Sequence, residues 1–182
     1  ADGVPHEWVA SVKSCVADIA SRFTTNRMLR DYQQRFYDKL AARKREITAG
    51  DYMLAREIAA WKRKVSAAWD GVRVVDVQRV KIDNEAIFVG SNYHFEVTVN
   101  VAGLEPSDIG AELVIARQIE KGQAVNVVET IRMKEIAAEG SLVTYALDYR
   151  PDRAGTFDVA LRIFPSNPRL PHRMDFALVK WA

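Results

Sequence analysis

The chain has 182 residues, of which 48% are hydrophobic and 27% are charged, and its formal net charge is +2. The hydrophobic fraction is large enough for a core, the charged fraction is ordinary for a soluble globular protein, and the length suits one domain or two small ones. No uninterrupted apolar run reaches the roughly 18 residues of a membrane span, so the sequence excludes a transmembrane protein and we expect no membrane partner.

Helical periodicity marks the first seventy residues. Apolar side chains at three- and four-residue spacing predict an amphipathic helix over residues 8–23. Residues 24–26 (Thr-Thr-Asn) can accept hydrogen bonds from the first N–H groups of a helix, which predicts a break and then a second helix. Gly50 should end that helix, and Asp51 should cap a third one that ends at residues 70–71. The three apolar stripes are Trp8, Val9, Val12, Cys15, Val16, Ile19 and Phe23; Met28, Leu29, Tyr32, Phe36 and Leu40; and Leu54, Ile58, Trp61, Val65 and Trp69.

Cys15 is the only cysteine, so the chain cannot form an internal disulfide. It falls on the apolar stripe of the first helix, where we expect a small buried core residue rather than a reactive thiol. A chain without disulfides, whose first ten residues have neither a basic start nor an apolar stretch, fits the cytoplasm. The absence of an initiator Met indicates a fragment or a processed product.

The hydrophobic period changes from 3.6 to 2 after Gly71. In residues 93–101 (YHFEVTVNV) apolar and polar side chains alternate, which predicts a strand with one buried face. Turn-type residues separate further runs of this kind, and about seven strands in roughly 110 residues predict an antiparallel β-sandwich of immunoglobulin-like size. The other predicted strands are Val72–Ile82, Ile109–Gln118, Ala124–Ile136, Ser141–Tyr149, Thr156–Phe164 and Arg173–Trp181.

The predicted fold class is therefore α+β, with about three helices over residues 1–70 and a β-sandwich domain over residues 71–182. Charge also differs along the chain, because residues 27–64 hold eleven Lys and Arg against five Asp and Glu. This basic stretch could contact nucleic acid. Its Lys and Arg fall mostly opposite the apolar stripes, however, so we favour a solvated face or docking onto an acidic domain surface, and a nucleic-acid partner is the weaker alternative.

No pattern for catalysis or for a cofactor stands out. The three histidines, His6, His94 and His172, lie in different predicted elements without metal-ligand spacing. A glycine-rich nucleotide loop and a Gly-x-Ser-x-Gly elbow are both missing. Three of the four tryptophans belong to helical stripes, whereas Trp181 is the penultimate residue of the last predicted strand. Because flat aromatic faces pack on glucose rings, Trp181 and Tyr93 are the candidate carbohydrate contacts.

Several short segments along the chain are informative through their order. They are Trp8-x-x-Ser11-Val12-Lys13, Phe23-Thr-Thr-Asn-Arg27-Met28, Asp31-Tyr32 and Ala55-Arg56-Glu57-x-Ala59-x-Trp61-Lys62 among the helices, and Leu104-Glu105-Pro106-Ser107-Asp108-Ile109, Gly155-x-Phe157, Asn167-Pro168-x-Leu170 and Leu178-Val179-Lys180-Trp181-Ala182 among the strands. In this order they resemble the carboxyl-terminal region of α-glucan phosphorylases, most closely the bacterial short-type glycogen phosphorylases. The resemblance covers most of the chain.

This resemblance implies a parent glycosyltransferase that binds pyridoxal phosphate and cleaves α-1,4-glucans with inorganic phosphate to give glucose 1-phosphate. The family's cofactor lysine lies in a Gly-Thr-x-x-Met-Lys motif, and no lysine here has that context, since Met133-Lys134 follows Thr130-Ile131-Arg132. We therefore assign no catalytic, cofactor-binding or metal-binding residue to the chain and expect it to be inactive alone.

Two functional interpretations follow. In the first, the chain is the carboxyl-terminal, non-catalytic portion of a glucan phosphorylase, and its helices complete or brace the catalytic lobe. The apolar stripes would then be exposed in isolation and would drive self-association. In the second, the sandwich is an autonomous carbohydrate-binding or protein-interaction module that holds α-glucan through exposed aromatic residues.

Overall fold

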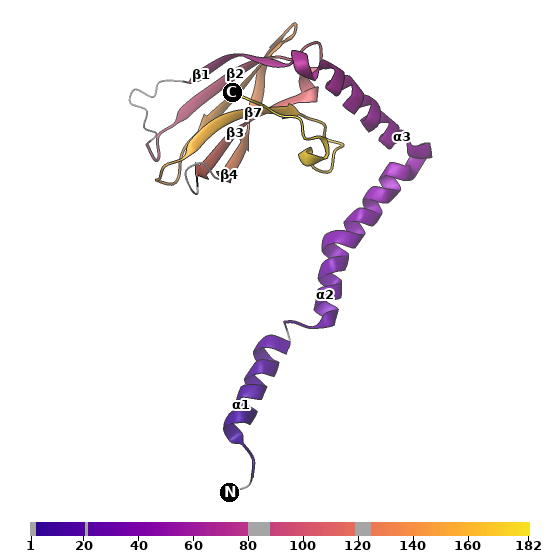
Figure 1. The fold of residues 1–182 in the computed structure, drawn as a ribbon, viewed down its shortest axis with the longest axis vertical. Helices are drawn as coiled ribbons and strands as arrows, with labels where there is room; N and C mark the ends of the chain where they lie inside the picture. Colours follow the sequence, from indigo (N-terminus) through magenta and orange to yellow (C-terminus); the bar gives the residue numbers. More distant parts are fainter. Residues whose placement is uncertain (1–2, 21, 80–87, 119–124) are drawn as a thin grey trace. The chain divides into compact units, whose positions relative to one another are not determined.

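The structure is a computed structural model in which residues 3–20, 22–79, 88–118 and 125–182 are described. The chain forms two compact units, Ala1–Glu57 and Ile58–Ala182. The first unit is helical, and the second holds the end of a helix and two β-sheets (Figure 1). No helix within the described ranges is long and apolar enough to cross a bilayer.

Helices account for the first unit, as the 3.6-residue period predicts. The elements are α1 (His6–Cys15) followed by a π-helical segment (Val16–Ala20), α2 (Thr25–Tyr32) followed by a second π-helical segment (Gln33–Tyr37), and α3 (Asp38–Ala68), which continues into the second unit. The predicted break is confirmed at Thr24, whose side chain accepts a hydrogen bond from the Arg27 N–H at 3.2 Å. None of the described residues of this unit is buried.

Two expectations for the helical unit are wrong. Cys15 is exposed rather than buried, because the first unit contains no core that could cover the apolar stripe of α1. Asp51 does not cap a helix, because it lies in the left-handed region at φ +54°, whereas a capping residue needs an extended backbone. Its carboxylate instead pairs with the Arg56 guanidinium at 2.5 Å. Gly50, also left-handed at φ +57°, lies in the kink over residues 49–52 that interrupts α3.

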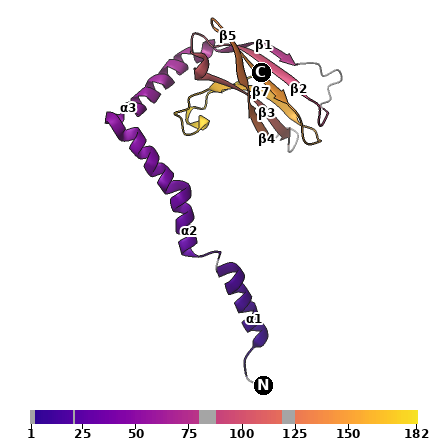
Figure 2. The same ribbon diagram turned by 180° about the vertical axis from the view of Figure 1, so that it is seen from behind.

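The second unit contains two four-stranded antiparallel sheets (Figures 1 and 2). The strand order is β1-β2-β6-β5 in the first sheet and β4-β3-β7-β8 in the second. The bounds are Arg73–Arg79 for β1, Tyr93–Asn100 for β2, Ile109–Gln118 for β3, Val125–Arg132 for β4, Lys134–Glu139 for β5, Leu142–Tyr149 for β6, Asp158–Pro165 for β7 and Lys180–Trp181 for β8.

The described residues hold eight strands where the sequence predicts seven. Of the predicted strand Ala124–Ile136, residue 124 lies outside the described ranges. The rest is divided at Met133, where the chain leaves β4 in one sheet and enters β5 in the other. Met133 is buried, and its N–H donates to the Ala111 carbonyl at 2.9 Å, which fixes the crossing. The predicted strand 173–181 is a 3₁₀ turn (Arg173–Phe176) followed by the short β8. Of the predicted strand 72–82, β1 covers 73–79, and residues 80–82 lie outside the described ranges.

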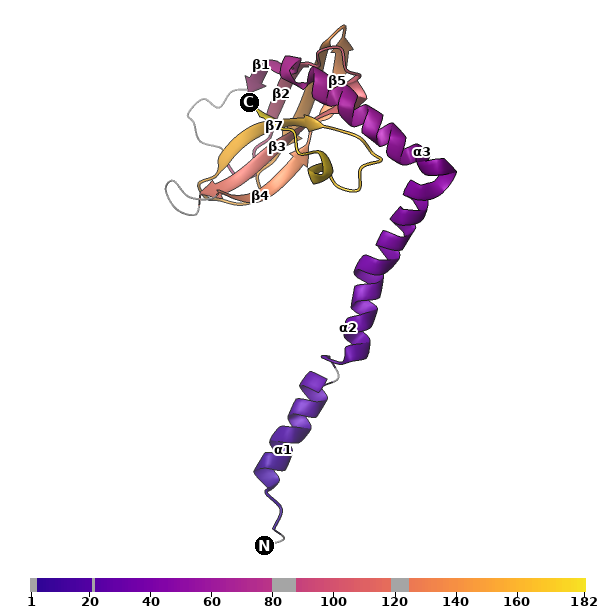
Figure 3. The same cartoon turned by 45° about the vertical axis from the view of Figure 1, so that its right-hand side comes forward.

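The strand order is that of an immunoglobulin-like sandwich. Named A, B, C, C′, D, E, F and G in chain order, the strands form an A-B-E-D sheet and a C′-C-F-G sheet. The expected alternation holds along β2, where Tyr93, Phe95, Val97 and Val99 are buried. Residues of both sheets share one core with Val65, Trp69 and Val72, which lie at and just beyond the end of α3. In Figure 3 the last turns of α3 lead directly into β1.

Candidate functional site

The helical unit exposes apolar side chains of the kind that other proteins bury. On the first two predicted stripes the exposed fraction reaches 66% for Trp8, 73% for Phe23 and 65% for Leu40. Exposed apolar side chains on this scale are typical of surfaces that contact another protein, a membrane or a ligand. We call this set the helical apolar surface; it comprises Trp8, Val12, Val16, Ile19, Phe23, Met28, Leu29, Tyr32, Phe36, Tyr37 and Leu40.

Part of the helical apolar surface is already ordered by contacts within the helices. The Tyr32 ring lies 5.9 Å from the Phe36 ring and 6.4 Å from the Tyr37 ring, measured between centroids. The Arg27 guanidinium lies 5.5 Å from the centroid of the Phe23 ring and pairs with Asp31 at 2.8 Å. The aromatic side chains are therefore held in a defined arrangement, which lowers the entropy that a partner must remove on binding.

A buried carboxylate joins the end of α3 to the sandwich. Asp108 is 8% exposed, and it accepts hydrogen bonds from the Trp61 indole N–H and the Lys64 ammonium, each at 2.7 Å. Its second oxygen also accepts the Glu105 N–H at 3.1 Å. Because the charge is met by three donors, its burial is compensated. We call this arrangement the Asp108 joint. The sequence signal for it was the Glu105-Pro106-Ser107-Asp108 segment, an acidic residue three positions after a helix-start position.

Further contacts hold the same helix end. The Trp61 ring packs edge-on against Phe176 with centroids 5.4 Å apart, and the Lys62 ammonium donates to the Asp175 carbonyl at 2.6 Å. From β8, Lys180 donates to the backbone carbonyls of Asp70 and Val72. The last turns of α3 are thus fixed to loops and strands far away in the sequence and belong to the rigid part of the sandwich unit.

Trp181 contacts Arg162, which belongs to an ion-pair network around the buried Glu112. Glu112 is 3% exposed on β3, and its two carboxylate oxygens pair with Arg162 and Arg173. The Arg162 guanidinium in turn lies 5.4 Å from the centroid of the Trp181 ring. Trp181 itself remains 58% exposed, so part of its indole is open to a ligand. This predicted carbohydrate contact is accessible.

Tyr93, the second predicted carbohydrate contact, lies on the buried face of β2. Its side chain is only 8% exposed and belongs to the core, and its hydroxyl accepts the Phe88 N–H at 2.7 Å. The alternation of β2 points Tyr93 inward together with Phe95 and Val97. Its ring is therefore buried, whereas a sugar contact needs an exposed face, and its hydroxyl is bonded to the backbone of Phe88.

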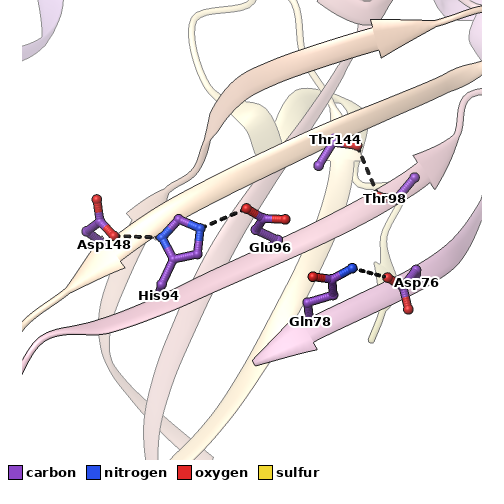
Figure 4. Close-up of polar contacts among 7 residues, drawn as sticks. All are labelled: Asp76, Gln78, His94, Glu96, Thr98, Thr144 and Asp148. Atoms are coloured by element: carbon purple, nitrogen blue, oxygen red, sulfur yellow. Dashed lines mark hydrogen bonds and ion pairs between the residues drawn. The ribbon is translucent and has the colours of Figure 1, made fainter. Parts of the chain in front are cut away.

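His94 lies on the solvent-facing side of the first sheet, between two carboxylates (Figure 4). Its Nδ1 is 2.7 Å from Asp148 and its Nε2 is 2.9 Å from Glu96. Hydrogen bonds to Asp148 and then to Glu96 raise the pKa of His94 above its ordinary 6.5. Figure 4 also shows two neighbouring polar pairs, Thr98–Thr144 and Gln78–Asp76, each joined by a hydrogen bond.

The described residues do not fit pyridoxal phosphate or a metal ion. Lys134, the only lysine after a methionine, is exposed on the edge strand β5, and the two buried carboxylates, Asp108 and Glu112, already have protein partners. Within the described ranges no group of three or more His, Cys, Asp and Glu side chains is arranged to hold a metal.

The comparisons with known proteins all point to phosphorylases of glycogen or maltodextrin. The sequence pattern of the family described as glycogen phosphorylase C-terminal domain matches residues 69–182. Maltodextrin phosphorylase of Thermococcus litoralis is 29% identical over 178 residues, which are 96% of this chain and 20% of that protein. Glycogen phosphorylases of Mycobacterium bovis and Mycobacterium tuberculosis are each 26% identical over 181 residues, 99% of this chain and 21% of theirs. The chain spans about a fifth of the length of these relatives.

We predict that Asp108→Ala lowers the free energy of unfolding of the sandwich unit by about 1.5–3 kcal/mol, since it leaves Trp61 and Lys64 without their charged acceptor. Urea unfolding followed by tryptophan fluorescence measures this. Asp76→Ala, an exposed aspartate on β1, is the matched control and should change stability by less than about 0.5 kcal/mol. Equal effects of the two substitutions would show that the joint contributes nothing.

A second prediction concerns pH. Because the pKa of His94 is higher in the folded chain than in the unfolded one, its pairing stabilises the fold fully below pH 6.5 and stops doing so as the pH rises through the raised value. In Asp148→Asn the pKa of His94 should fall. The variant should be less stable than wild type at acidic pH, and this difference in the free energy of unfolding should become smaller as the pH rises. NMR titration of the His94 ring measures the pKa; an unchanged value in Asp148→Asn would contradict the assignment.

Proposed function

The chain belongs to the glycogen phosphorylase C-terminal domain family, and from that premise we propose that it is the non-catalytic carboxyl-terminal portion of an α-glucan phosphorylase that braces the catalytic lobe. The parent reaction would be phosphorolysis of α-1,4-glucan to glucose 1-phosphate. The helical apolar surface is the observation that carries the proposal, because nothing within the described part of the helical unit covers it.

The occupant of the helical apolar surface is, in this proposal, the rest of the same polypeptide. The relatives match this chain over nearly its full length but are about five times longer, and the chain corresponds to about a fifth of each. In a polypeptide of that length, the part outside the matched region would be covalently linked to this chain. It would therefore be present next to the helical apolar surface at high effective concentration. Burial of each large apolar side chain would contribute about 1.5–3 kcal/mol to the attachment.

We propose a division of labour at residues 70–71. Residues 1–70 would contribute helices to the catalytic lobe, and residues 71–182 would form an appended sandwich. In this division the Asp108 joint would anchor the last helix of the first part, because it ties Trp61 and Lys64 near the end of α3 to the sandwich.

The chemistry of the reaction stays outside this chain in the proposal. Pyridoxal phosphate, when bound in the parent enzyme, would supply its phosphate group for proton transfer to the substrate phosphate. No residue described here is assigned to that step, and the isolated chain is expected to be inactive. A cytoplasmic location remains a prediction from the sequence.

A second candidate function is glucan binding by the sandwich. The open indole of Trp181, with Arg162 stacked on it, is the observation that favours it. An aromatic ring held rigidly from one side is a suitable platform for a glucose ring, because little side-chain entropy is lost on contact.

For the docking function we predict that Phe36→Ser combined with Leu40→Ser, introduced in the complete polypeptide that contains this chain, lowers phosphorolysis of maltodextrin at least tenfold. The two side chains are 53% and 65% exposed here and would lose their apolar contacts with the lobe. Release of glucose 1-phosphate measures the loss. Gln34→Ser, on the same helical run, is the control and should stay within twofold.

Self-association provides an independent readout of the same surface. The isolated chain should form concentration-dependent oligomers in sedimentation velocity, and the Phe36→Ser, Leu40→Ser variant should reduce them. A double variant with unchanged phosphorolysis and unchanged sedimentation would overturn the bracing role.

For the second function we predict that Trp181→Ala weakens retention of the chain on immobilised amylose about five- to tenfold, through loss of ring stacking worth roughly 1 kcal/mol or more. Affinity electrophoresis at several amylose concentrations measures the retention. Trp181→Phe keeps an aromatic face and should restore most of it. Identical mobility of Trp181→Ala and wild type would exclude this contact.

A further inference from the structure

A cavity of about 510 Å³ opens at one end of the sandwich, between residues 88–89 and the connection from β6 to β7. Its volume falls inside the roughly 300–1,000 Å³ range of small-molecule sites. Three aromatic side chains, Phe88, Tyr149 and Phe157, line it together with the apolar floor residues Ile115, Val128 and Val159. None of these residues has a role in the proposed bracing function.

The walls of this cavity are fixed by named contacts. The Phe88 N–H donates to the buried Tyr93 hydroxyl at 2.7 Å, and the Gly90 N–H donates to the Pro151 carbonyl at 2.9 Å. Residues 88–90 are therefore tied to the strand end that carries Tyr149. Phe88 itself is 65% exposed, so its ring is open at the rim of the cavity.

The opposite wall is equally constrained. The Arg117 guanidinium lies 5.0 Å from the centroid of the Phe157 ring. Gly155 packs against the same ring: a Cβ at that position would lie 3.0 Å from Phe157 Cε2, and the backbone there is at φ +147°. Only glycine fits such a position without strain, so residues 155–157 are held in one arrangement.

The polar groups of the cavity are balanced in charge. Glu129 from β4 and Arg153 from the β6–β7 connection both line it, and Thr156 adds a hydroxyl. A carboxylate and a guanidinium each bind two neighbouring hydroxyl groups of a polyol, one as acceptor and the other as donor. Aromatic rings supply flat apolar faces for the C–H groups of a sugar. The Arg153 guanidinium is also paired with Asp152 at 3.0 Å, which partly neutralises its charge, so Glu129 would repel the phosphate of a phosphorylated ligand. A lipid would leave both charged groups without hydroxyl partners.

We propose that this cavity binds one or two glucosyl units of a neutral α-glucan chain, with Phe88 and Tyr149 as stacking surfaces and Glu129 and Arg153 as hydroxyl partners. The choice of glucan among neutral saccharides rests on the proposed function, whereas the site itself rests on the cavity. Tyr93 acts here as a positioning residue, through its hydroxyl on the Phe88 backbone.

The test is calorimetric titration of the 182-residue chain with maltoheptaose. Phe88→Ala and Glu129→Ala should each weaken binding at least tenfold, both in the wild-type chain and in a Trp181→Ala background. Both positions lie outside the buried core, so the fold is expected to survive, and circular dichroism checks this. Val75→Ala, an exposed apolar residue on β1, is the control and should leave binding unchanged.

Each alternative outcome has its own meaning. Unchanged affinity in Phe88→Ala and Glu129→Ala would overturn the site and leave glucan contact to Trp181. Absence of maltoheptaose binding by the wild-type chain at millimolar concentration would overturn both sites, and tighter binding of glucose 1-phosphate than of maltoheptaose would overturn the neutral ligand. None of these results bears on bracing, which the Phe36 and Leu40 substitutions test separately.

Discussion

A single buried carboxylate organises the junction on which the rest of the molecule depends. The Asp108 carboxylate accepts hydrogen bonds from Trp61 and Lys64 of α3 and from the backbone N–H of Glu105. Its charge is therefore compensated at a position where water has little access. A buried charge without these partners would destabilise the unit strongly, which makes the position of the helix end obligatory rather than optional. The core agrees with this geometry, because Val65 and Trp69 pack with residues of both sheets. The helix end and the sandwich therefore fold as one body.

The two units differ in the source of their stability. The sandwich has a continuous core and a second ion network, in which the buried Glu112 pairs with Arg162 and Arg173. It therefore has interactions of its own that can stabilise it without the helical unit. The helical unit has no buried residue among those described, and isolated helices of this length are marginal in water. Its free energy of folding must come from contacts with something else. This asymmetry is the physical reason for the proposed attachment to a larger lobe, and it explains why the apolar residues of α1 and α2 are exposed here.

Much of this arrangement was predictable from local patterns. The alternation in β2, the break at Thr24 and the turn at Gly50 follow from side-chain period and backbone preference, which act over a few residues. The division of 124–136 into β4 and β5 was not predictable in this way. The strand-like pattern of apolar and polar residues continues through Met133, and only the crossing from one sheet to the other interrupts the strand. The short β8 was overestimated for a similar reason, because an alternating pattern does not reveal where a strand loses its neighbour.

The sequence by itself determined that the chain is α+β, that its first part is helical and its second a sandwich, and which family it resembles. These features depend on the order and period of residues, which the chain carries locally. Tertiary structure alone decided that Tyr93 supports Phe88 from the core, that Trp181 stands open above Arg162, and that Asp108 meets Trp61 and Lys64. It also brought Phe88, Glu129 and Arg153 to one cavity from separate strands and loops. Such contacts join residues tens of positions apart, and their existence depends on sheet order and register, which no local pattern encodes.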